Sequence, residues 1–414
     1  MPIDPAGGAG NPVTDALEEV LRRAAEVQSG AVADYIPELA LIDPELLAIS
    51  ATSVLGHQYS AGSSEAEFTI QSISKPFVYA LALADLGVEE VHSHVGFEPS
   101  GEPFNAISLD PAGRPANPLI NAGAIVTSAL IDAPTPQARF ERIRSVLSAF
   151  AGRELQLDER VYASESETGH RNRALGHLTL AAGALPRGVA DATEVYFQQC
   201  ALLVTAADLA MMGATLANAG VNPVTNVEVV TSEVARQTLS LMTSCGMYDR
   251  AGEWAFRVGM PAKSGVGGGI VAVKPGQFGV GVFSPRLDEA GNSARGTRAL
   301  TLLSQEFELN LLEHHHAPAS PIQELAVTAS GGMTVSLRGE IDFIAVEQLV
   351  HDVREAAGGD PADASSITID LTAVTRVGLA AARLLTAAAA GRSAWGSTVQ
   401  VVDPSHLLAV ALTG

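Results

Sequence analysis

The chain has 414 residues, of which 25 are basic and 46 are acidic, so its formal net charge is −21. A chain this acidic repels nucleic-acid phosphates and anionic lipids, so we expect neither a nucleic acid nor a membrane surface as a partner. Its length exceeds that of one ordinary hydrophobic core, which predicts two domains.

The cysteine content and the first residues of the chain help to predict the cellular compartment. Only Cys200 and Cys245 are present, so a disulfide framework is not expected. Residues 1–11 lack the basic and apolar regions of a signal peptide. The sequence contains no run of 18 uncharged apolar residues, so we expect no membrane span. These features predict a reduced, cytoplasmic protein.

The predicted elements up to residue 312 begin and end with strands and are helical between them. After a helix over residues 14–28, residues 48–55, 58–60 and 68–70 read as strands. Helical patterns follow at 75–86, 121–130, 139–151, 174–220 and 227–241, with a Pro- and Gly-rich loop over 99–122. Residues 258–283 read as paired strands and 298–312 as a last helix. This order predicts a sheet formed from the two ends, with a helical subdomain inserted between them.

A polar break over residues 313–321 separates this region from a different pattern. It contains three adjacent histidines, His314 to His316, but adjacent positions do not face one another, so a linker is favoured over a metal site. Beyond it, strands at 333–337, 366–371 and 398–402 alternate with helices that end at 357, 390 and 412, which predicts a small α/β domain. The predicted domains are therefore 1–312 and 322–414.

The strongest chemical signal is a Ser-x-x-Lys motif at Ser72 and Lys75. Residues three apart share a face at the start of an apolar helix, so a neutral Lys75 is placed to take the proton of Ser72. Burial lowers the pKa of a lysine toward that role. The alternative is that Ser72 caps the helix and Lys75 lies on the surface.

A second signal is the run Lys263-Ser264-Gly265 with its following glycines. Such a strand accompanies Ser-x-x-Lys in serine β-lactamases and penicillin-binding proteins, where it lies along the substrate. The alternative is a plain glycine-rich hairpin. The chain has only three lysines, Lys75, Lys263 and Lys274, and two of them lie in these motifs. The pair of motifs favours a serine acyl-enzyme.

Seven motifs together resemble the serine-dependent glutaminase family, over roughly residues 32–312. The β-lactamase element Ser-Asp-Asn is absent. The motifs present, in the family's order, are Asp34-Tyr35-Ile36-Pro37, Gln71-Ser72-Ile73-Ser74-Lys75-Pro76, Asn117-Pro118-Leu119-Ile120-Asn121-Ala122-Gly123-Ala124-Ile125, Ser164-Glu165-Ser166-Glu167-Thr168-Gly169-His170-Arg171-Asn172, Tyr196-Phe197-Gln198, Ser244-Cys245-Gly246-Met247-Tyr248-Asp249 and Lys263-Ser264-Gly265-Val266.

The resemblance implies roles for individual residues. Ser72 matches the family's nucleophile and Lys75 its activating partner, with Tyr248 as a proton carrier. The positions that match the family's glutamine-binding residues are Tyr35, Ser72, Asn121, Glu165, Asn172, Tyr196, Tyr248 and Val266. Lys263, Ser264 and Gly265 are structural and electrostatic neighbours of that site. Gly291 and Asn292 continue the resemblance without an evident role.

Residues 322–414 resemble a STAS domain. The carriers are Val335-Ser336-Leu337-Arg338-Gly339-Glu340-Ile341-Asp342, then the strand at 367–374 and the helix start at 378–385. Where the regulatory members of that family have Asp-Ser-Ser-Gly, this chain has Thr375-Arg376-Val377-Gly378, so neither serine position keeps a hydroxyl. We therefore prefer a docking or oligomerisation module to a phosphorylation switch.

Taken together, the resemblances imply an α/β (α+β) protein. A β-lactamase-like sheet with flanking helices and an inserted helical subdomain precedes a small STAS domain. The implied activity is hydrolysis of L-glutamine to L-glutamate and ammonia through a γ-glutamyl ester on Ser72, without cofactor or metal. A homo-oligomer, dimer or tetramer, is also implied, with a protein partner for the STAS domain. The alternatives are a β-lactamase, peptidase or esterase of the same fold, or a non-catalytic STAS-based regulator.

Overall fold

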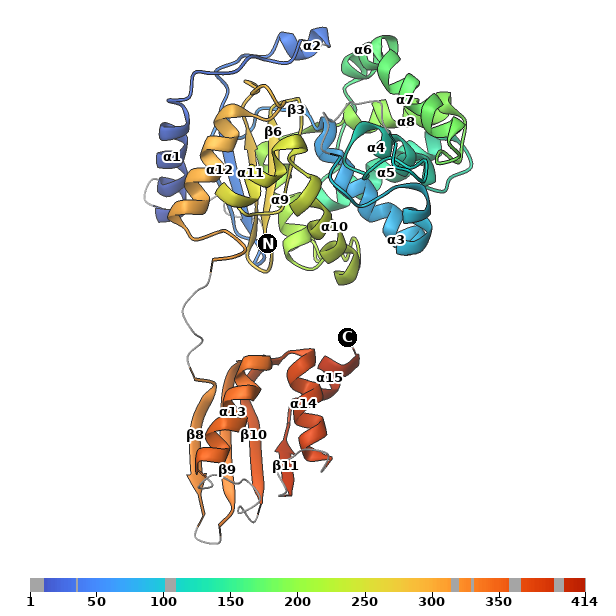
Figure 1. Cartoon of the computed structure of the whole chain (residues 1–414). Helices are drawn as coiled ribbons and strands as arrows, with labels where there is room; N and C mark the ends of the chain where they lie inside the picture. Colours follow the sequence, from blue (N-terminus) through green and yellow to red (C-terminus); the bar gives the residue numbers. More distant parts are fainter. Residues whose placement is uncertain are drawn as a thin grey trace. The chain divides into compact units, whose positions relative to one another are not determined.

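The structure is a computed structural model that describes residues 11–34, 36–100, 109–313, 320–328, 331–356, 366–390 and 398–413. The chain divides into two compact units, Met1–Glu313 and His314–Gly414 (Figure 1). The three histidines 314–316 lie outside the described residues.

An antiparallel sheet of five strands organises the first unit. In spatial order its strands are β2 (Gln58–Gly62), β1 (Ala48–Ser53), β7 (Phe278–Phe283), β6 (Gly269–Lys274) and β5 (Ala262–Ser264). The early strand β1 pairs with the late strand β7, for example Ile49 with Val282. The predicted sheet from the two ends of the region is thus present. Two strands differ from the prediction. The strand β3 (Phe68–Thr69) lies outside this sheet and pairs in a separate two-stranded ribbon with β4 (Leu203–Val204), which interrupts a stretch expected to be helical.

Helices cover both faces of this sheet. On one face α1 (Pro12–Ala24) and α12 (Ala294–Glu306) pack on the strands, and their core includes Leu17, Ile49 and Leu300. Helix α1 begins where the Asn11 side chain accepts a hydrogen bond from Val13 N, with Pro12 in the first turn. On the other face α9 (Ala206–Ala217) lies so close to β7 that a Cβ on Gly281 would be 2.1 Å from Ala206 O. Glycine at that position therefore allows the helix to pack on the strand.

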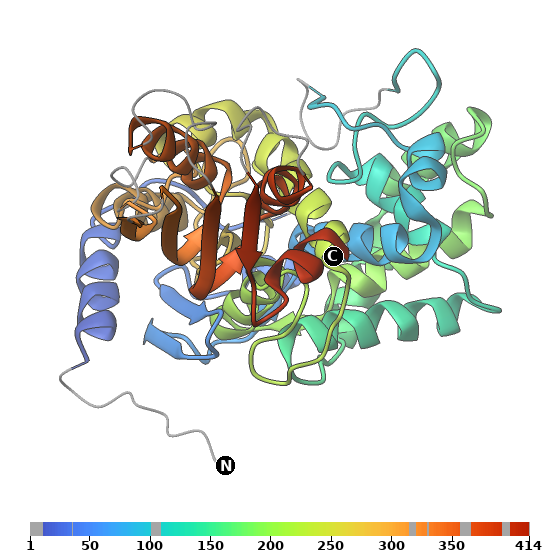
Figure 2. The ribbon, with the colours of Figure 1, turned by 90° about the horizontal axis from the view of Figure 1, so that it is seen from below.

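A helical subdomain lies beside the sheet, as both views of the ribbon show (Figures 1 and 2). Its members are η1 (Gln71–Ile73), α3 (Ser74–His94), α4 (Asn121–Leu130), α5 (Pro136–Ala151), α6 (Glu159–Thr168), α7 (His170–Ala181) and α8 (Val189–Cys200). Between them and the sheet lies one core, with Phe77, Phe150 and Phe197 among its buried side chains. The remaining elements of the unit are α2 (Pro37–Ala40), α10 (Ser232–Cys245), η2 (Tyr248–Arg250) and α11 (Ala251–Arg257).

The second unit is a mixed sheet with its own core. Its strand order is β11 (Val399–Val402), β10 (Ile367–Val377), β9 (Met333–Ile341) and β8 (Ile322–Val327). The β10 strand is parallel to both of its neighbours, and β8 is an antiparallel edge strand that the sequence pattern did not indicate. Helices α13 (Phe343–Ala356), α14 (Leu379–Ala389) and α15 (Leu407–Thr413) complete it. The mixed α/β class predicted for the whole chain is confirmed.

Within the described part of the chain, no helix is long and apolar enough to cross a membrane.

Candidate active site

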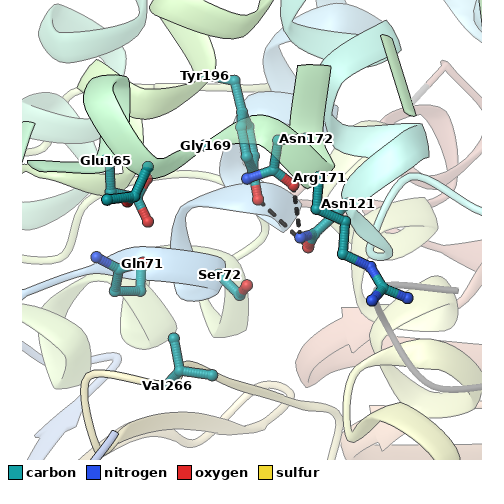
Figure 3. Close-up of a pocket in the computed structure, with 10 residues that line it drawn as sticks. Gln71, Ser72, Asn121, Glu165, Gly169, Arg171, Asn172, Tyr196 and Val266 are labelled. Atoms are coloured by element: carbon teal, nitrogen blue, oxygen red, sulfur yellow. Dashed lines mark hydrogen bonds between the residues drawn. The ribbon is translucent and has the colours of Figure 1, made fainter. Parts of the chain in front are cut away.

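A pocket of about 280 Å³ in the first unit brings together several of the predicted site residues (Figure 3). Six of them line it: Ser72, Asn121, Glu165, Asn172, Tyr196 and Val266. They come from η1, α4, α6, α7, α8 and the loop between β5 and β6, so elements far apart in the sequence meet at one point. Lys75 and Tyr248 lie behind this lining, and Tyr35 lies outside the described residues.

Ser72 lies in a strained turn at the entrance of helix α3. The preceding residue, Gln71, has a φ of 50°, a left-handed conformation that a residue with a side chain adopts only at a cost. The short 3₁₀ helix η1 then leads directly into α3. Ser72 is 5% exposed, and Figure 3 shows its hydroxyl directed into the pocket. The nucleophile candidate is therefore nearly buried at the floor of the cavity.

Lys75 is a fully buried cation next to the pocket. Burial lowers the pKa of its ammonium to about 8, and the Glu165 carboxylate opposes that shift. Its Nζ donates a hydrogen bond of 2.7 Å to Asn121 Oδ1. Among the hydrogen bonds of the described residues, none joins Lys75 to Ser72. A lysine with a pKa this close to neutrality can exchange a proton in the working pH range.

Tyr248 connects Ser72 to the Lys-Ser-Gly strand. Its phenol donates a hydrogen bond of 3.0 Å to Ser264 O and also has a side-chain hydrogen bond with Ser72. Burial raises the pKa of the phenol, and the bond with Ser72 opposes the shift. The Nζ atom of Lys263 is 4.0 Å from the centroid of the Tyr248 ring and donates to Ser264 O. The predicted neighbours of the site therefore contact Tyr248 directly.

The second buried lysine, Lys263, differs from Lys75 in its electrostatics. Burial and the repulsion from Lys75 lower its pKa well below the ordinary value. It lies in β5, and its side chain is 0% exposed. Its position over the Tyr248 ring and its bond to Ser264 O indicate a structural role.

Glu165 supplies the pocket with a buried carboxyl group. It is 6% exposed, and burial raises its pKa to about 7, with the Lys75 ammonium opposing that shift. Its Oε2 atom is buried and has no hydrogen-bond partner. Figure 3 shows this carboxyl group facing the cavity across from Ser72. An unpartnered buried carboxylate oxygen is costly to a fold and is suited to receive a cationic ligand group.

Two asparagines and a tyrosine form a polar wall on the other side. Asn121 Nδ2 donates to Asn172 Oδ1 at 3.0 Å, and Tyr196 Oη donates to Asn121 Oδ1 at 3.4 Å (Figure 3). Because Asn121 also accepts from Lys75, one amide connects the wall to the buried cation. Such groups can bind a carboxylate or an amide.

The loop after β5 presses against the segment that holds Ser72. A Cβ on Gly265 would be 2.9 Å from the side chain of Ile73, and one on Gly267 would be 2.7 Å from Thr69 O. Only glycines fit there, and their presence lets Val266 line the pocket beside Ser72. The close approach explains why glycine follows the Lys-Ser pair.

Four lining residues were not among those predicted: Gln71, Thr168, Gly169 and Arg171. All of them lie inside or next to the quoted motifs, so their position in those runs was the available signal. Arg171 is an exposed residue that lines the pocket close to Asn172. His170, Asp249 and Cys245, which also lie inside the quoted motifs, do not line it. Within the described residues, no group of three or more His, Cys, Asp or Glu could hold a metal ion.

The comparisons with known proteins agree with one another. A family model described as "Glutaminase" matches residues 30–312, and one described as "Mlab, STAS domain" matches residues 326–413. A protein named Glutaminase from Corynebacterium glutamicum is 41% identical over 400 residues, 96% of this chain and 95% of that protein. A solved structure titled as Mglu in its glutamate form has a TM-score of 0.85 at 37% identity, covering 95% of this chain and 99% of that one.

A further relative is longer than this chain. The protein named Glutaminase 1 from Bradyrhizobium diazoefficiens is 52% identical over 301 residues, which are 73% of this chain and 49% of that protein. Glutaminase 2 of the same organism is matched over 46% of its length. The chain thus spans about half the length of these two relatives. Both resemblances inferred from the sequence, to the glutaminases and to the STAS domains, are confirmed.

Proposed function

This chain belongs to the glutaminase family, and from that premise we propose that it hydrolyses L-glutamine to L-glutamate and ammonia. The observation that carries the proposal is the buried carboxyl group of Glu165, whose Oε2 atom has no partner, in the same pocket as the Ser72 hydroxyl. One group is suited to an α-ammonium and the other to an acyl carbon. The two together fit a small amino acid with a reactive side-chain amide.

The substrate is held at its charged end by the polar lining. Glu165 pairs with the α-ammonium, which supplies the hydrogen-bond donor that its buried Oε2 atom lacks. Asn121 and Asn172 contact the α-carboxylate, and Tyr196 lies beside them. The side-chain amide then extends toward Ser72. A cavity of about 280 Å³ admits a ligand of this size.

The first chemical step is acylation of the nucleophile. The neutral form of Lys75, accessible because its pKa is about 8, takes the proton of Ser72 as Oγ attacks the amide carbon. The backbone N–H groups of Ser72 and Val266 stabilise the oxyanion. Tyr248, hydrogen-bonded to Ser72, passes a proton to the departing nitrogen and is reprotonated with the proton that Lys75 took from Ser72, so both side chains return to their starting state. The C–N bond breaks, ammonia leaves, and a γ-glutamyl ester remains on Ser72.

Water completes the cycle. It attacks the ester carbonyl in the same oxyanion site, and the proton that it gives up passes to Ser72 Oγ as that oxygen leaves. The products are L-glutamate and the free enzyme, so no cofactor or metal enters the balance. All residues used in these steps lie in the first unit.

For the C-terminal region we infer a docking or oligomerisation role. It has a hydrophobic core of its own, and its described residues are not among those that line the pocket. We place the catalytic domain at 1–312, a linker at 313–321 and the STAS domain at 322–414.

The deciding experiment is ammonia release from L-glutamine by the wild type and by Ser72→Ala. L-asparagine tests whether the enzyme accepts a shorter side chain, and nitrocefin tests the β-lactamase alternative. We expect turnover of glutamine, little of asparagine and none of nitrocefin, and loss of turnover in Ser72→Ala. A wild type that leaves glutamine intact contradicts the function, and an active Ser72→Ala variant contradicts the mechanism.

A further inference from the structure

A chain of hydrogen bonds runs behind the pocket, among residues that the proposed mechanism does not use. Gln199 Nε2 on α8 donates to Ser74 Oγ at 3.2 Å, and Ser74 Oγ donates to the carbonyl of Gln71 at 2.8 Å. At its far end Ser128 Oγ on α4 donates to Gln199 Oε1 at 2.7 Å. Ser74, Ser128 and Gln199 are all 0% exposed.

This series of hydrogen bonds ends at the strained turn that carries the proposed nucleophile. Gln71 has a φ of 50°, and Ser72 follows it directly. A residue with a side chain keeps this conformation only where its surroundings over-determine it. The Gln71 carbonyl accepts from both the backbone N–H and the hydroxyl of Ser74, which holds the peptide plane before Ser72. The orientation of the nucleophile thus depends on Ser74.

Polar groups are unexpected in this part of the fold. Helices α3, α4 and α8 share one hydrophobic core, in which apolar side chains such as Phe77, Ile125 and Phe197 are completely buried. Burying an amide there costs free energy unless its polar atoms are hydrogen-bonded. Both Nε2 and Oε1 of Gln199 are hydrogen-bonded. The same helices carry Asn121 and Tyr196 into the pocket. The network therefore joins the turn to the helices that build the rest of the site.

We propose that Ser74 and Gln199 are positioning residues, which hold the left-handed turn at Gln71 so that Ser72 faces the substrate. The proposal rests on the proposed glutaminase function. Neither residue touches the substrate, because neither lines the pocket. Their loss should therefore lower kcat for glutamine and leave KM nearly unchanged, since a nucleophile displaced by a fraction of an ångström reacts more slowly.

The test compares Ser74→Ala, Gln199→Leu and their double variant with the wild type in steady-state glutamine hydrolysis. Gln199→Leu removes the amide and keeps an apolar side chain of similar size. The matched control is Thr127→Val, because Thr127 is a buried hydroxyl on α4 that donates only to the carbonyl of Gly123. Ser74→Thr, which keeps a hydroxyl, is the conservative variant. Circular dichroism and thermal unfolding accompany each protein.

We expect kcat to fall about tenfold in Ser74→Ala and in Gln199→Leu, with KM within about twofold of the wild type. The double variant should lose no more than about the larger single effect, because both substitutions break one network. Ser74→Thr should recover most of kcat, and Thr127→Val should keep it. A folded Gln199→Leu with wild-type kcat overturns the proposal. So does a Gln199→Leu chain that does not fold, since the amide is then a purely structural group. A wild type without glutaminase activity contradicts instead the proposed function on which the inference rests.

Discussion

Lys75 and Glu165 are both buried beside the pocket, and each shifts the pKa of the other toward its charged form. Burial shifts the pKa of each group toward its neutral form, and this effect is the larger one. The result is a lysine with a pKa of about 8 and a glutamate with a pKa of about 7. The proposed base and the proposed ammonium-binding group thus have pKa values close to each other and near neutrality.

The first prediction concerns the pH dependence of kcat/KM for glutamine. Glu165 must be ionised, which requires a pH above about 7, and Lys75 must be neutral, which requires a pH above about 8. Activity should therefore rise with pH across this range and level off above it. Steady-state rates between about pH 6 and pH 9 check it, and a profile that falls from pH 7 to pH 8.5 contradicts the assignment of Lys75 as the base.

The second prediction tests what Glu165 holds. Glu165→Gln should lower kcat/KM for L-glutamine by about 100-fold, because a buried charge-assisted bond to the ammonium is lost. It should have little effect on glutaramate, which keeps the amide and the carboxylate but lacks the amino group. Glu194→Gln is the control, since Glu194 is a half-buried carboxylate that bonds Arg173 and Ser166 outside the pocket. Equal losses on the two substrates in Glu165→Gln count against an ammonium site.

A third prediction isolates the phenol of Tyr248. Tyr248→Phe keeps the ring beside Lys263 and removes only the hydroxyl, so we expect kcat to fall about 100-fold with a small change in KM. Tyr162→Phe removes a phenol that bonds Glu194 and should leave both constants unchanged. Ammonia release measures each. A Tyr248→Phe enzyme with wild-type kcat excludes this phenol as a proton carrier.

The fourth prediction is a gain in stability from an inactivating substitution. The pKa of Lys75 is 10.5 in an unfolded chain and about 8 in the fold, so the buried ammonium costs about 3 kcal/mol at pH 7. The sign follows from proton binding. Between about pH 8 and pH 10.5 the unfolded chain holds more protons, so the free energy of unfolding of the wild type rises with pH in that window.

Lys75→Met should therefore raise the free energy of unfolding at pH 7 by about 2 kcal/mol, after allowance for the lost bond to Asn121. Urea denaturation at pH 7 and at pH 10 measures the difference between the two proteins. It should shrink at the higher pH, where the wild-type lysine is neutral. A Lys75→Met chain that is less stable than the wild type at pH 7 contradicts the burial argument.

Local patterns predicted most of the fold, and the exceptions have physical reasons. The glycine- and valine-rich run forms the paired strands β6 and β7 as expected, because its turn residues are explicit in the sequence, and β7 also pairs with β1. No local feature indicates which partner a two-residue strand selects, so β3 was expected in the main sheet and instead pairs with β4. Helix α6 was not predicted, since it is short and mostly polar, with few buried residues.

Some features of the candidate site were likewise predictable from the sequence, and others were not. The three-residue spacing alone predicted that Ser72 and Lys75 share one face of a helix. The family motifs indicated the site residues that other elements contribute. Neither source indicated that Lys75 bonds Asn121, or that Gln71 adopts a left-handed turn. These features arise from contacts between helices that are distant in sequence. The bond from Gln199 to Ser74 spans 125 residues and has no local signature.

A last prediction separates the two units. Among the described residues, those that line the pocket all belong to the first unit, and each unit has hydrophobic clusters of its own. A chain that ends at Glu313 should therefore fold and keep kcat/KM for glutamine within about twofold of the full chain, as ammonia release and circular dichroism would show. The truncation leaves Lys274 bonded to Asn310 O, so this contact of β6 with the segment after α12 is retained. A folded but inactive truncated chain would mean that the STAS domain contributes to catalysis, which the arrangement of the pocket gives no reason to expect.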